Sequence, residues 1–400
     1  MGDVAVLFGG PSPEHDVSVL TGLQAAHELL SSGRRPVAIY WTKLGTFVEV
    51  DPSLEASSFL EGAPKGATSL TLSAVPGGGF VGEGSRLRGS KALEIDAVIL
   101  CTHGGPGEDG TLQAALDLAG IAYTGPSVQG AAIGMDKLAF GAVMAAAGIP
   151  SLDRLPLTPL TSDVGFEGPF IVKPRFGGSS IGIEVVADLA VAKARLGANP
   201  HLARGAVLEP YRPDLGDLQV AVRTFPSLQL SAIERPLRSG AGAGEILGYA
   251  DKYVGGEGMA SAPRELPAQV TDGQRDVILD LAARVSEVTG VRGVTRIDYL
   301  TNGDEIYVNE INTIPGSLAR YLFIDRWCRS GSSSMIWWPR RSPRQPIATA
   351  RLVPMGWCCV VLHPSRPSWP EGARRARGAR ARRSAPQLRL RDQHPERAGR

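Results

Sequence analysis

The chain has 400 residues, of which 43% are hydrophobic and 20% charged, and its formal net charge at pH 7 is +2; these values are typical of a globular protein of about two or three domains. No apolar run reaches the roughly 18 residues of a membrane span, which excludes a transmembrane helix. The four cysteines, two of them adjacent, exclude a disulfide or zinc framework, so we expect a cytoplasmic protein without a membrane partner.

The N-terminal part alternates strand-like apolar runs with helix-like stretches, and its first run, Val4–Phe8, reads as a buried strand and not as a secretory signal. This strand–loop–helix order predicts a parallel sheet with ligand-binding groups at the carboxyl ends of its strands. The Gly- and Ser-rich stretch Ser53–Leu93 is expected to be a surface excursion. The further elements expected are a helix at Val17–Leu30, strands at Val37–Trp41 and Ala97–Cys101, and a helix at Leu112–Ala119.

The following part is expected to end in a helix and a strand pair. Residues Ala268–Thr289 have the spacing of a long amphipathic helix, and the two strands Gly293–Leu300 and Glu305–Ile311 follow it, joined by a turn. The elements expected before this helix are a helix at Asp136–Ala147 and strands at Phe170–Lys173, Ile183–Val186, Ala206–Glu209 and Gln219–Arg223.

The last part, residues 326–400, differs in composition from the rest. It contains 17 Arg, no Lys and three acidic residues, a net charge of +14 that leaves −12 for residues 1–325. It shows neither the period of a helix nor that of a strand. A GC-rich gene read in the wrong frame would give this composition, and resequencing near the codon for Asp325 tests that hypothesis. Its rival is a genuine, disordered basic tail that binds nucleic acid or anionic lipid.

Four polar side chains alternate along the last two expected strands. Arg296 and Asp298 share one face of the first strand, and Glu310 and Asn312 share one face of the second. Carboxylate and amide oxygens suit Mg²⁺, which takes its other ligands from phosphate and water, and a guanidinium suits a developing negative charge. The alternative is a solvated face with paired charges, which the sequence Thr-Ile-Pro-Gly at 313–316 disfavours.

A glycine-rich loop follows the strand that ends at Lys173. Its sequence Gly177–Ser180 lets backbone N–H groups approach phosphates, and the lysine adds positive charge. The same composition is also ordinary for a turn. The loop therefore indicates a phosphate site only together with two further lysines, Lys137 at a helix start and Lys252 between two tyrosines.

Polar residues also follow two strands of the expected parallel sheet. His103 comes after the strand that ends at Cys101, and Glu14 and Ser18 come after the first strand. Because the carboxyl ends of parallel strands meet at one edge, these groups are expected to face the same site. Acidic capping of the following helix is the alternative for Glu14 and its neighbours.

The ordered motifs of residues 3–325 resemble those of the D-alanine–D-alanine ligases, members of the ATP-grasp superfamily. The resemblance covers about four-fifths of the chain, and its specificity comes from the ordered set. The motifs are Gly9-Gly10-x-Ser12-x-Glu14-x-x-Val17-Ser18, His103-Gly-x-x-Gly107-Glu108-Asp109-Gly110, Tyr123-Thr124-Gly125, Met135-Asp136-Lys137, Val172-Lys173-Pro174, Gly178-Ser179-Ser180-x-Gly182, Tyr249-x-x-Lys252-Tyr253 and Glu310-x-Asn312-Thr313-x-Pro315-Gly316.

The resemblance implies an N-terminal parallel-sheet α/β domain followed by a two-domain ATP-grasp fold that holds ATP between its halves. A basic tail that the family lacks completes the chain and is expected to be disordered or frameshifted. The implied boundaries are 1–128 for the α/β substrate domain, 129–209 for the central domain, 210–325 for the C-terminal domain with the metal site, and 326–400 for the tail.

The resemblance also implies roles for the motif residues. Those implied at the metal, two Mg²⁺ or Mn²⁺ ions, are Asp298, Glu310 and Asn312. Those implied at ATP are Lys137, Lys173 and Lys252 on the phosphates, Glu209 on the adenine amino group, and Asp217, where the family usually has Glu, on the ribose. Those implied at the amino-acid substrates are Glu14, Ser179, Tyr253 and His103 for the first D-alanine, with Arg296 and the Gly316 N–H as oxyanion hole.

The implied activity is ATP-dependent formation of D-alanyl-D-alanine through an acyl phosphate, for peptidoglycan precursor synthesis. In the family that the chain resembles, Tyr at the position of Tyr253 accompanies D-alanine and not D-lactate as second substrate, and the sequence leaves D-serine open. The sequence departs from the family after Gly316, because Ser317 follows at once and Tyr321 stands where the family has the Ser that binds the second substrate. We expect Ser317 to take over that contact. The tail replaces the closing C-terminal helix, which puts the activity of this chain in question.

Two alternatives stay open. Another ATP-grasp carboxylate–amine ligase would share the metal and phosphate residues but not Glu14, His103 and Tyr253. An inactive remnant whose basic tail binds nucleic acid belongs to a different class, and nucleic-acid binding is not expected unless the tail is genuine. The sequence leaves a homodimer open.

Overall fold

A computed structural model describes residues 3–82, 91–237 and 263–324, together with the backbone of two short strands, β19 (Leu352–Met355) and β20 (Cys358–Val361). All of these residues belong to one compact unit, Met1–Ser365. Within the described ranges, no helix is long and apolar enough to cross a membrane. The strands β19 and β20 pair with each other inside the segment expected to lack regular structure, and the rest of residues 326–400 lies outside the described residues.

The first sheet has eight strands in the order β6-β5-β4-β3-β2-β1-β7-β8. Its parallel part is formed by β1, β2, β7 and β8, of which β1, β2 and β7 match predicted strands and β8 was not predicted. Alternate residues of β1 enter two different cores, Val6 and Phe8 on one face and Ala5 and Leu7 on the other, which explains why the strand is apolar throughout. The strands are β1 (Asp3–Gly9), β2 (Val37–Trp41), β3 (Phe47–Val50), β4 (Thr68–Ser73), β5 (Gly79–Gly82), β6 (Lys91–Ala92), β7 (Ile95–Leu100) and β8 (Ala122–Tyr123).

Helices cover both faces of this sheet. Helix α1 (His15–Ser31) buries Val19 and Leu23 in one core, and helix α2 (Thr111–Ala119) buries Leu112 and Leu116 in the other. Short 3-10 turns lie at Ala56–Phe59 and Gly105–Gly107.

The interpretation of residues 53–93 as a surface excursion is wrong. Strands β4, β5 and β6 lie in this stretch and extend the sheet antiparallel from β3. The reason is local burial: Leu70 of β4 faces the core between the exposed Ser69 and Thr71, and Phe80 of β5 is fully buried in the same core. The glycine-rich sequence supplies the turn before β5 and both end residues of β5, Gly79 and Gly82.

A second sheet has the order β11-β10-β12-β9, and all its pairs are antiparallel. Its core includes Phe170 and Leu208, which pack with Ala192 of helix α5. The elements are α3 (Val128–Met135), α4 (Lys137–Ala146), β9 (Leu155–Leu157), β10 (Phe170–Pro174), β11 (Glu184–Val186), α5 (Leu189–Ala198), a 3-10 turn at Pro200–Leu202, and β12 (Ala206–Pro210).

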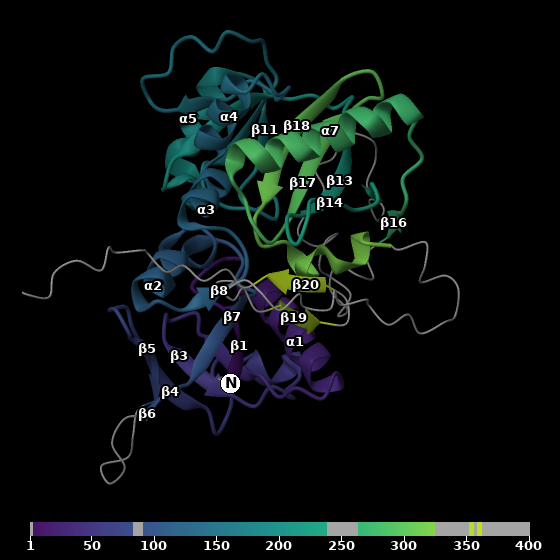
Figure 1. Cartoon of the computed structure of the whole chain (residues 1–400). Helices are drawn as coiled ribbons and strands as arrows, with labels where there is room; N and C mark the ends of the chain where they lie inside the picture. The colour runs from purple at the N-terminus through teal and green to yellow at the C-terminus, as the bar shows by residue number, and fades with distance from the viewer. Residues whose placement is uncertain (1–2, 83–90, 238–262, 325–351, 356–357, 362–400) are drawn as a thin grey trace, which may run out of the picture. The chain divides into compact units, whose positions relative to one another are not determined.

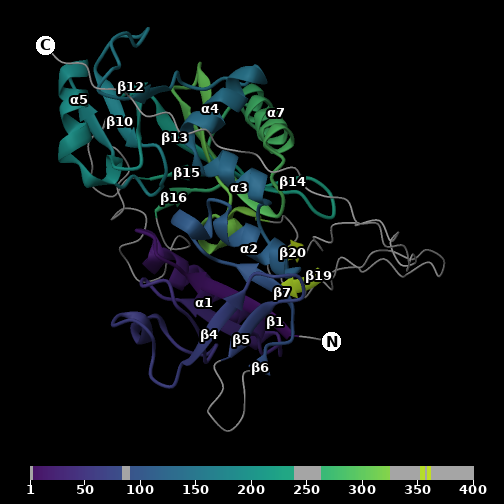
Figure 2. The ribbon, with the colours of Figure 1, turned by 90° about the vertical axis from the view of Figure 1, so that its left-hand side faces the viewer.

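The third sheet has the order β14-β13-β17-β18 and carries the predicted last strand pair. Helix α7 (Asp272–Thr289) packs Ile278, Leu281 and Val285 against it and lies along it in Figure 1. Helices α3 and α4 lie beside α7 (Figure 2). The strands are β13 (Gly216–Arg223), β14 (Gln229–Leu230), β17 (Val294–Thr301) and β18 (Ile306–Asn312), with a separate pair of β15 (Arg235–Pro236) and β16 (Arg264–Glu265) and a closing 3-10 turn at Gly316–Leu322.

The predicted fold class, mixed α/β with a parallel-containing first sheet followed along the chain by two further sheets, is confirmed. The exact domain boundaries at 128, 209 and 325 stay a prediction. The expected helix at Ala268–Thr289 begins later, at Asp272, because Thr271 caps it. Thr271 Oγ1 accepts a hydrogen bond from Gln274 N, and Gln274 Oε1 accepts one from Thr271 N.

Candidate active site

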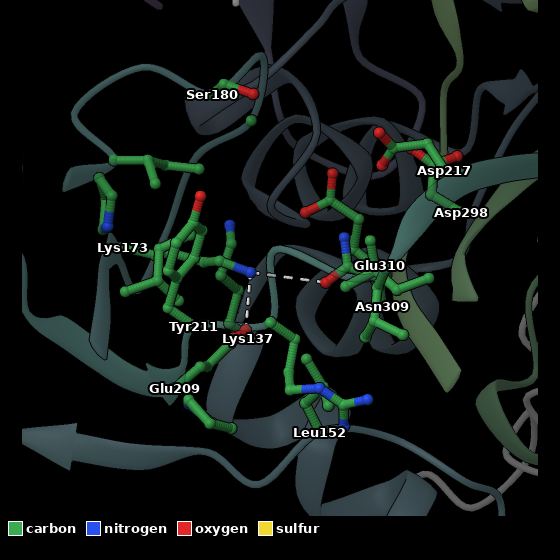
Figure 3. Close-up of a pocket in the computed structure, with 18 of the residues that line it drawn as sticks. Lys137, Leu152, Lys173, Ser180, Glu209, Tyr211, Asp217, Asp298, Asn309 and Glu310 are labelled. Atoms are coloured by element: carbon green, nitrogen blue, oxygen red, sulfur yellow. Dashed lines mark hydrogen bonds and ion pairs between the residues drawn. The ribbon is translucent and has the colours of Figure 1, made fainter. Parts of the chain in front are cut away.

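A pocket lies between the second and third sheets; we call it the sheet pocket. Figure 3 shows its polar side chains, which come from β10, β12, β13, β17 and β18 and from the start of α4. The sequence-predicted residues that line it are Lys137, Lys173, Glu209, Asp217, Asp298 and Glu310. Residues more than 170 positions apart in the sequence thus line one cavity, and their individual roles stay predictions.

A buried charge cluster forms one wall of the sheet pocket. Glu209 is fully buried, and its two carboxylate oxygens meet Lys173 Nζ at 2.7 Å and Arg154 Nε at 3.0 Å. Burial would raise the pKa of Glu209, but these two cations hold it below its usual value. Arg154 also donates to the backbone oxygen of Asn309. Arg154 was missed, because a lone arginine ahead of a short strand carries no signal in the sequence.

Lys137 fixes the glycine-rich loop. Its ammonium donates to the backbone oxygen of Gly177 at 2.5 Å, and it is buried at the start of α4. Burial lowers the pKa of Lys137, and the negative charge of Glu310 acts in the opposite direction by raising it. The glycine-rich loop, Lys137 and Lys173 therefore line the same pocket. Lys252, the third lysine predicted to act with this loop, lies outside the described residues.

The predicted face of the last strand pair is present. Arg296 lies opposite Asn312, and Asp298 lies opposite Glu310. The Arg296 guanidinium grips Asp298 with two hydrogen bonds of 2.7 and 2.9 Å, and Asn312 Nδ2 donates to Asp298 at 3.2 Å. Cross-strand pairing of alternate residues thus gathers a guanidinium, two carboxylates and an amide on one face.

This donor set fits a hard cation. No group of three or more His, Cys, Asp or Glu suited to a metal occurs in the described part of the chain. Two facing carboxylates and one amide oxygen leave most positions around an ion to other oxygens. That is the arrangement Mg²⁺ prefers, because it keeps waters and takes substrate phosphates. The sheet pocket lies against both carboxylates.

A second, smaller pocket adjoins the first; we call it the turn pocket. It is lined by Glu14, His103, Glu108, Arg154, Arg296, Asn312, Ile314 and Gly316, and it shares Lys137, Gly177, Gly178 and Glu310 with the sheet pocket. The predicted strand-end groups Glu14 and His103 therefore face the predicted oxyanion donors. Arginines and carboxylates in a concave site are typical of recognition of a charged small molecule.

Glu14 connects the N-terminal part to the glycine-rich loop. Ser179 Oγ donates to Glu14 Oε1 at 2.5 Å. Gly104 has a φ of +64°, and a Cβ there would come within 2.5 Å of Glu14 Oε2. Only glycine therefore lets the backbone after His103 pass this carboxylate.

A buried hydrogen-bond cluster surrounds the turn that carries Gly316. Glu108 accepts from Gly104 N at 2.9 Å, from Ile314 N at 2.9 Å and from Thr313 Oγ1 at 3.1 Å. Burial and the charge of Glu14 raise the pKa of Glu108 to about 7, whereas burial lowers the pKa of His103 to about 4. Glu108 lies in one of the family motifs, but no separate role was predicted for it.

Three predicted contacts are not placed by the structure. Lys252 and Tyr253 lie outside the described residues, so their places at the phosphates and at the first substrate stay predictions. Ser317 is buried and lines neither pocket, which does not favour the contact expected of it. Tyr321 is half-buried, with the Arg264 guanidinium 4.3 Å from its ring centre, and loss of solvent around the hydroxyl raises the Tyr321 pKa to about 12.

Two family models match the chain: the one described as D-ala D-ala ligase N-terminus over residues 3–126, and the one described as D-ala D-ala ligase C-terminus over residues 152–335. Among curated proteins, the D-alanine–D-alanine ligase of Mycolicibacterium smegmatis is 31% identical over 350 residues, which cover 82% of this chain and 91% of that protein. The ligase of Rhodococcus erythropolis is 32% identical over 349 residues, covering 82% and 92%.

Solved structures of the same kind have a similar fold. The Helicobacter pylori D-alanine–D-alanine ligase matches with a TM-score of 0.63 and 24% identity, over 81% of this chain and 94% of that one. The VanG D-Ala:D-Ser ligase of Enterococcus faecalis matches with a TM-score of 0.62 and 24% identity, over 80% and 94%. At this identity the likeness carries the fold and leaves the choice of substrate to other observations.

Proposed function

Because the chain belongs to the D-alanine–D-alanine ligase family, we propose that it joins two D-alanine molecules into D-alanyl-D-alanine, a peptidoglycan precursor, with conversion of ATP to ADP and phosphate. The observation that carries the proposal is the pair of adjoining pockets. The sheet pocket offers lysines, glycine-loop N–H groups and carboxylates to a nucleotide, and the turn pocket offers Arg296 and Gly316 to an amino acid. Both pockets share Lys137 and Glu310, so the two ligands would meet there.

In the first step, a carboxylate oxygen of the first D-alanine attacks the γ-phosphorus of ATP, the bond to the β-phosphate oxygen breaks, and ADP leaves. This step needs positioning and charge compensation more than covalent help from the protein. Lys137 and Lys173 are placed to offset phosphate charge, and Lys137 also holds the loop at Gly177. The product is an acyl phosphate.

In the second step, the neutral amine of the second D-alanine attacks the acyl carbon and forms the C–N bond. The carbonyl π pair moves to oxygen, and the negative charge that develops there is met by Arg296 and the Gly316 N–H. Collapse breaks the bond to the phosphate oxygen, phosphate leaves, and the amine gives up one proton to solvent. The pairing of Arg296 with Asp298 keeps the guanidinium at the shared face.

We further propose Asp298, Glu310 and Asn312 as the residues that would hold Mg²⁺ or Mn²⁺, as two ions. The cations would neutralise the triphosphate and supply Lewis-acid polarisation of the transferred phosphoryl group. Removal of divalent ions with EDTA is expected to abolish phosphate release, and added Mg²⁺ to restore it. Loss of Mg²⁺-dependent protection against thermal unfolding in Glu310→Gln gives a readout independent of turnover.

The decisive test is phosphate release from ATP by the purified full-length chain with D-alanine, D-serine, D-lactate or L-amino acids. We expect release with D-alanine alone, and D-alanyl-D-alanine as product. Release only with a different acid and amine would favour another ATP-grasp ligase. The matches over residues 3–126 and 152–335 do not favour an inactive remnant. A cytoplasmic location and a homodimer stay predictions; native mass spectrometry tests the second.

A further inference from the structure

The turn that carries Gly316 is held from both sides by side chains of the N-terminal part of the chain. Before Gly316 in the chain, Glu108 Oε1 accepts from Thr313 Oγ1 and Ile314 N. Directly after Gly316, the Ser317 N–H donates to Thr21 Oγ1 at 3.1 Å. Thr21 lies in α1 and is 2% exposed. The backbone N–H groups of Ile314 and Ser317, which lie before and after Gly316, are thus bound by side chains 206 and 296 positions away in the sequence.

The backbone after Gly316 has an unfavourable conformation that needs support. Ser317, Leu318 and Ala319 have φ values of +53°, +49° and +48°. L-residues with a side chain rarely adopt this left-handed region, and a run of three is rarer than a single case. Such a segment persists when its surroundings hold it. Thr21 supplies a hydrogen bond to the first residue of the run, and Leu318 packs against both cores of the first sheet.

His103 completes the support. Thr21 Oγ1 lies 2.8 Å from His103 Nε2, and the Ile314 backbone also bonds the His103 ring. Burial lowers the pKa of His103 to about 4, so the ring is neutral at pH 7 and one nitrogen accepts. The Thr21 hydroxyl donates to that nitrogen while its oxygen accepts from Ser317 N–H. A chain of hydrogen bonds therefore runs from Ile314 through His103 and Thr21 to Ser317 and encloses Gly316.

We propose that Thr21 is a positioning residue for the ligation step: its hydroxyl, together with His103, fixes residues 314–317 so that the Gly316 N–H faces the acyl carbonyl oxygen. The inference rests on the proposed function of Gly316. It assigns to α1 a task separate from nucleotide binding, since Thr21 does not line the sheet pocket. Loosening the turn weakens the donor for the oxyanion, which forms when the amine attacks. Formation of the acyl phosphate depends on other groups.

The consequence is uncoupling. When the amine attack slows, water has more time to hydrolyse the acyl phosphate, and phosphate is released without dipeptide. Thr21→Val removes the hydroxyl and keeps the shape. We expect its dipeptide rate to fall at least about tenfold, a fraction of the 10²–10³ typical for complete loss of an oxyanion donor. The KM for ATP is expected to stay within about twofold, and phosphate released per dipeptide to rise above one.

Two variants serve as controls. Thr21→Ser keeps a hydroxyl and is expected to restore a ratio near one. Thr289→Val makes the same change at another buried helical threonine, whose hydroxyl bonds Val285 O at 2.6 Å on the far helix α7. It is expected to lower stability like any loss of a buried hydrogen bond and to leave the ratio of phosphate to dipeptide unchanged.

Amide hydrogen exchange tests the same idea without turnover. The segment that contains Gly316 and Ser317 is expected to exchange faster in Thr21→Val than in wild type, Thr21→Ser or Thr289→Val. If Thr21→Val does not fold, Thr21→Ala takes its place. A Thr21→Val enzyme with unchanged kcat, unchanged ratio and unchanged exchange of this segment overturns the inference. A wild-type enzyme that makes no dipeptide from D-alanine overturns the proposed function instead, and the exchange result still decides the role of Thr21 in the turn.

Discussion

At the scale of single residues, the site is defined by charges that hold one another in place. Arg296 is 6% exposed and donates two hydrogen bonds to Asp298. Each carboxylate oxygen of Glu209 forms an ion pair, one with Arg154 and the other with Lys173. Burying a charge is costly unless it is paired. The paired arrangement therefore keeps several ionised side chains buried at the site, where they act more strongly on a substrate than they would in water.

Arg296→Ala is expected to lower dipeptide formation by about 10²–10³ or more, because it removes a donor to the developing oxyanion. ATP binding is expected to stay measurable, since the nucleotide residues of the sheet pocket remain. Equilibrium binding of ATP and product formation, measured on the same preparation, check both statements. Near-normal dipeptide formation by this variant would refute the assignment of Arg296.

Glu108 and His103 are expected to give opposite slopes to the pH dependence of stability. Folded Glu108 keeps its proton up to about pH 7, whereas an unfolded Glu loses it near its usual pKa of 4.5; the folded state binds more protons between these values, so stability falls as pH rises. Folded His103 takes a proton only below about pH 4, against 6.5 when unfolded, so stability falls as pH decreases through that window. Over pH 4.5–6.5 the two effects oppose each other.

Glu108→Gln is therefore expected to expose the His103 slope. The free energy of unfolding of the variant should rise by about 2–3 kcal/mol from pH 4.5 to 6.5, while that of the wild type changes less over the same range. Urea denaturation at closely spaced pH values measures both curves. Parallel curves for the two proteins would show that Glu108 does not titrate in this window.

At the scale of elements, helix α7 packs against the third sheet, whose strands β17 and β18 carry the proposed metal ligands Asp298, Glu310 and Asn312. One side of the helix is buried against β13, β17 and β18, and the other is solvent-exposed. Because the face of β17 and β18 opposite this core bears Arg296 and Asp298, packing of α7 sets the position of catalytic groups that it does not touch.

Leu281→Ala is expected to lower the free energy of unfolding by about 2–5 kcal/mol, since it leaves a cavity in this core. Val277→Ala, on the same helix but 48% exposed, is the matched control and is expected to change stability much less. Chemical denaturation compares the two. An equal loss of stability in both variants would contradict the packing of α7 against the third sheet.

At the scale of the whole molecule, charge is divided along the chain. Residues 1–325 carry a net −12 and residues 326–400 a net +14. The residues that line the two pockets all come before residue 325, whereas the positive charge comes after it in the sequence. Ligation and any binding of polyanions are therefore expected to be separable.

Deletion of residues 366–400 is expected to weaken binding of DNA or heparin and to reduce its dependence on salt, because it removes 11 Arg and only three acidic residues. The rate of D-alanine-dependent phosphate release per folded molecule is expected to stay unchanged. Fluorescence anisotropy with labelled DNA and the phosphate assay measure the two quantities. A truncated chain that binds DNA as well as the full chain would place the polyanion site elsewhere.

The sequence by itself determined three of the four parallel strands, β1, β2 and β7, and the shared face of Arg296, Asp298, Glu310 and Asn312. Both follow from local periodicity and from alternation along a strand. Strands β4–β6 were missed, since their short runs are interrupted by glycine and serine. The ordered motifs identified the family and the candidate site residues, but not the distances between those residues.

Only the tertiary structure decided which side chains position those site residues. Arg154 on Glu209, Glu108 on Ile314 and Thr21 on Ser317 are contacts between residues far apart in the chain. Nothing in the local sequence of an arginine, a glutamate or a threonine marks which backbone group it will meet, because that depends on how three sheets pack. The chemistry-bearing residues were therefore readable from sequence, whereas the buried bonds that position them exist only once the chain has folded.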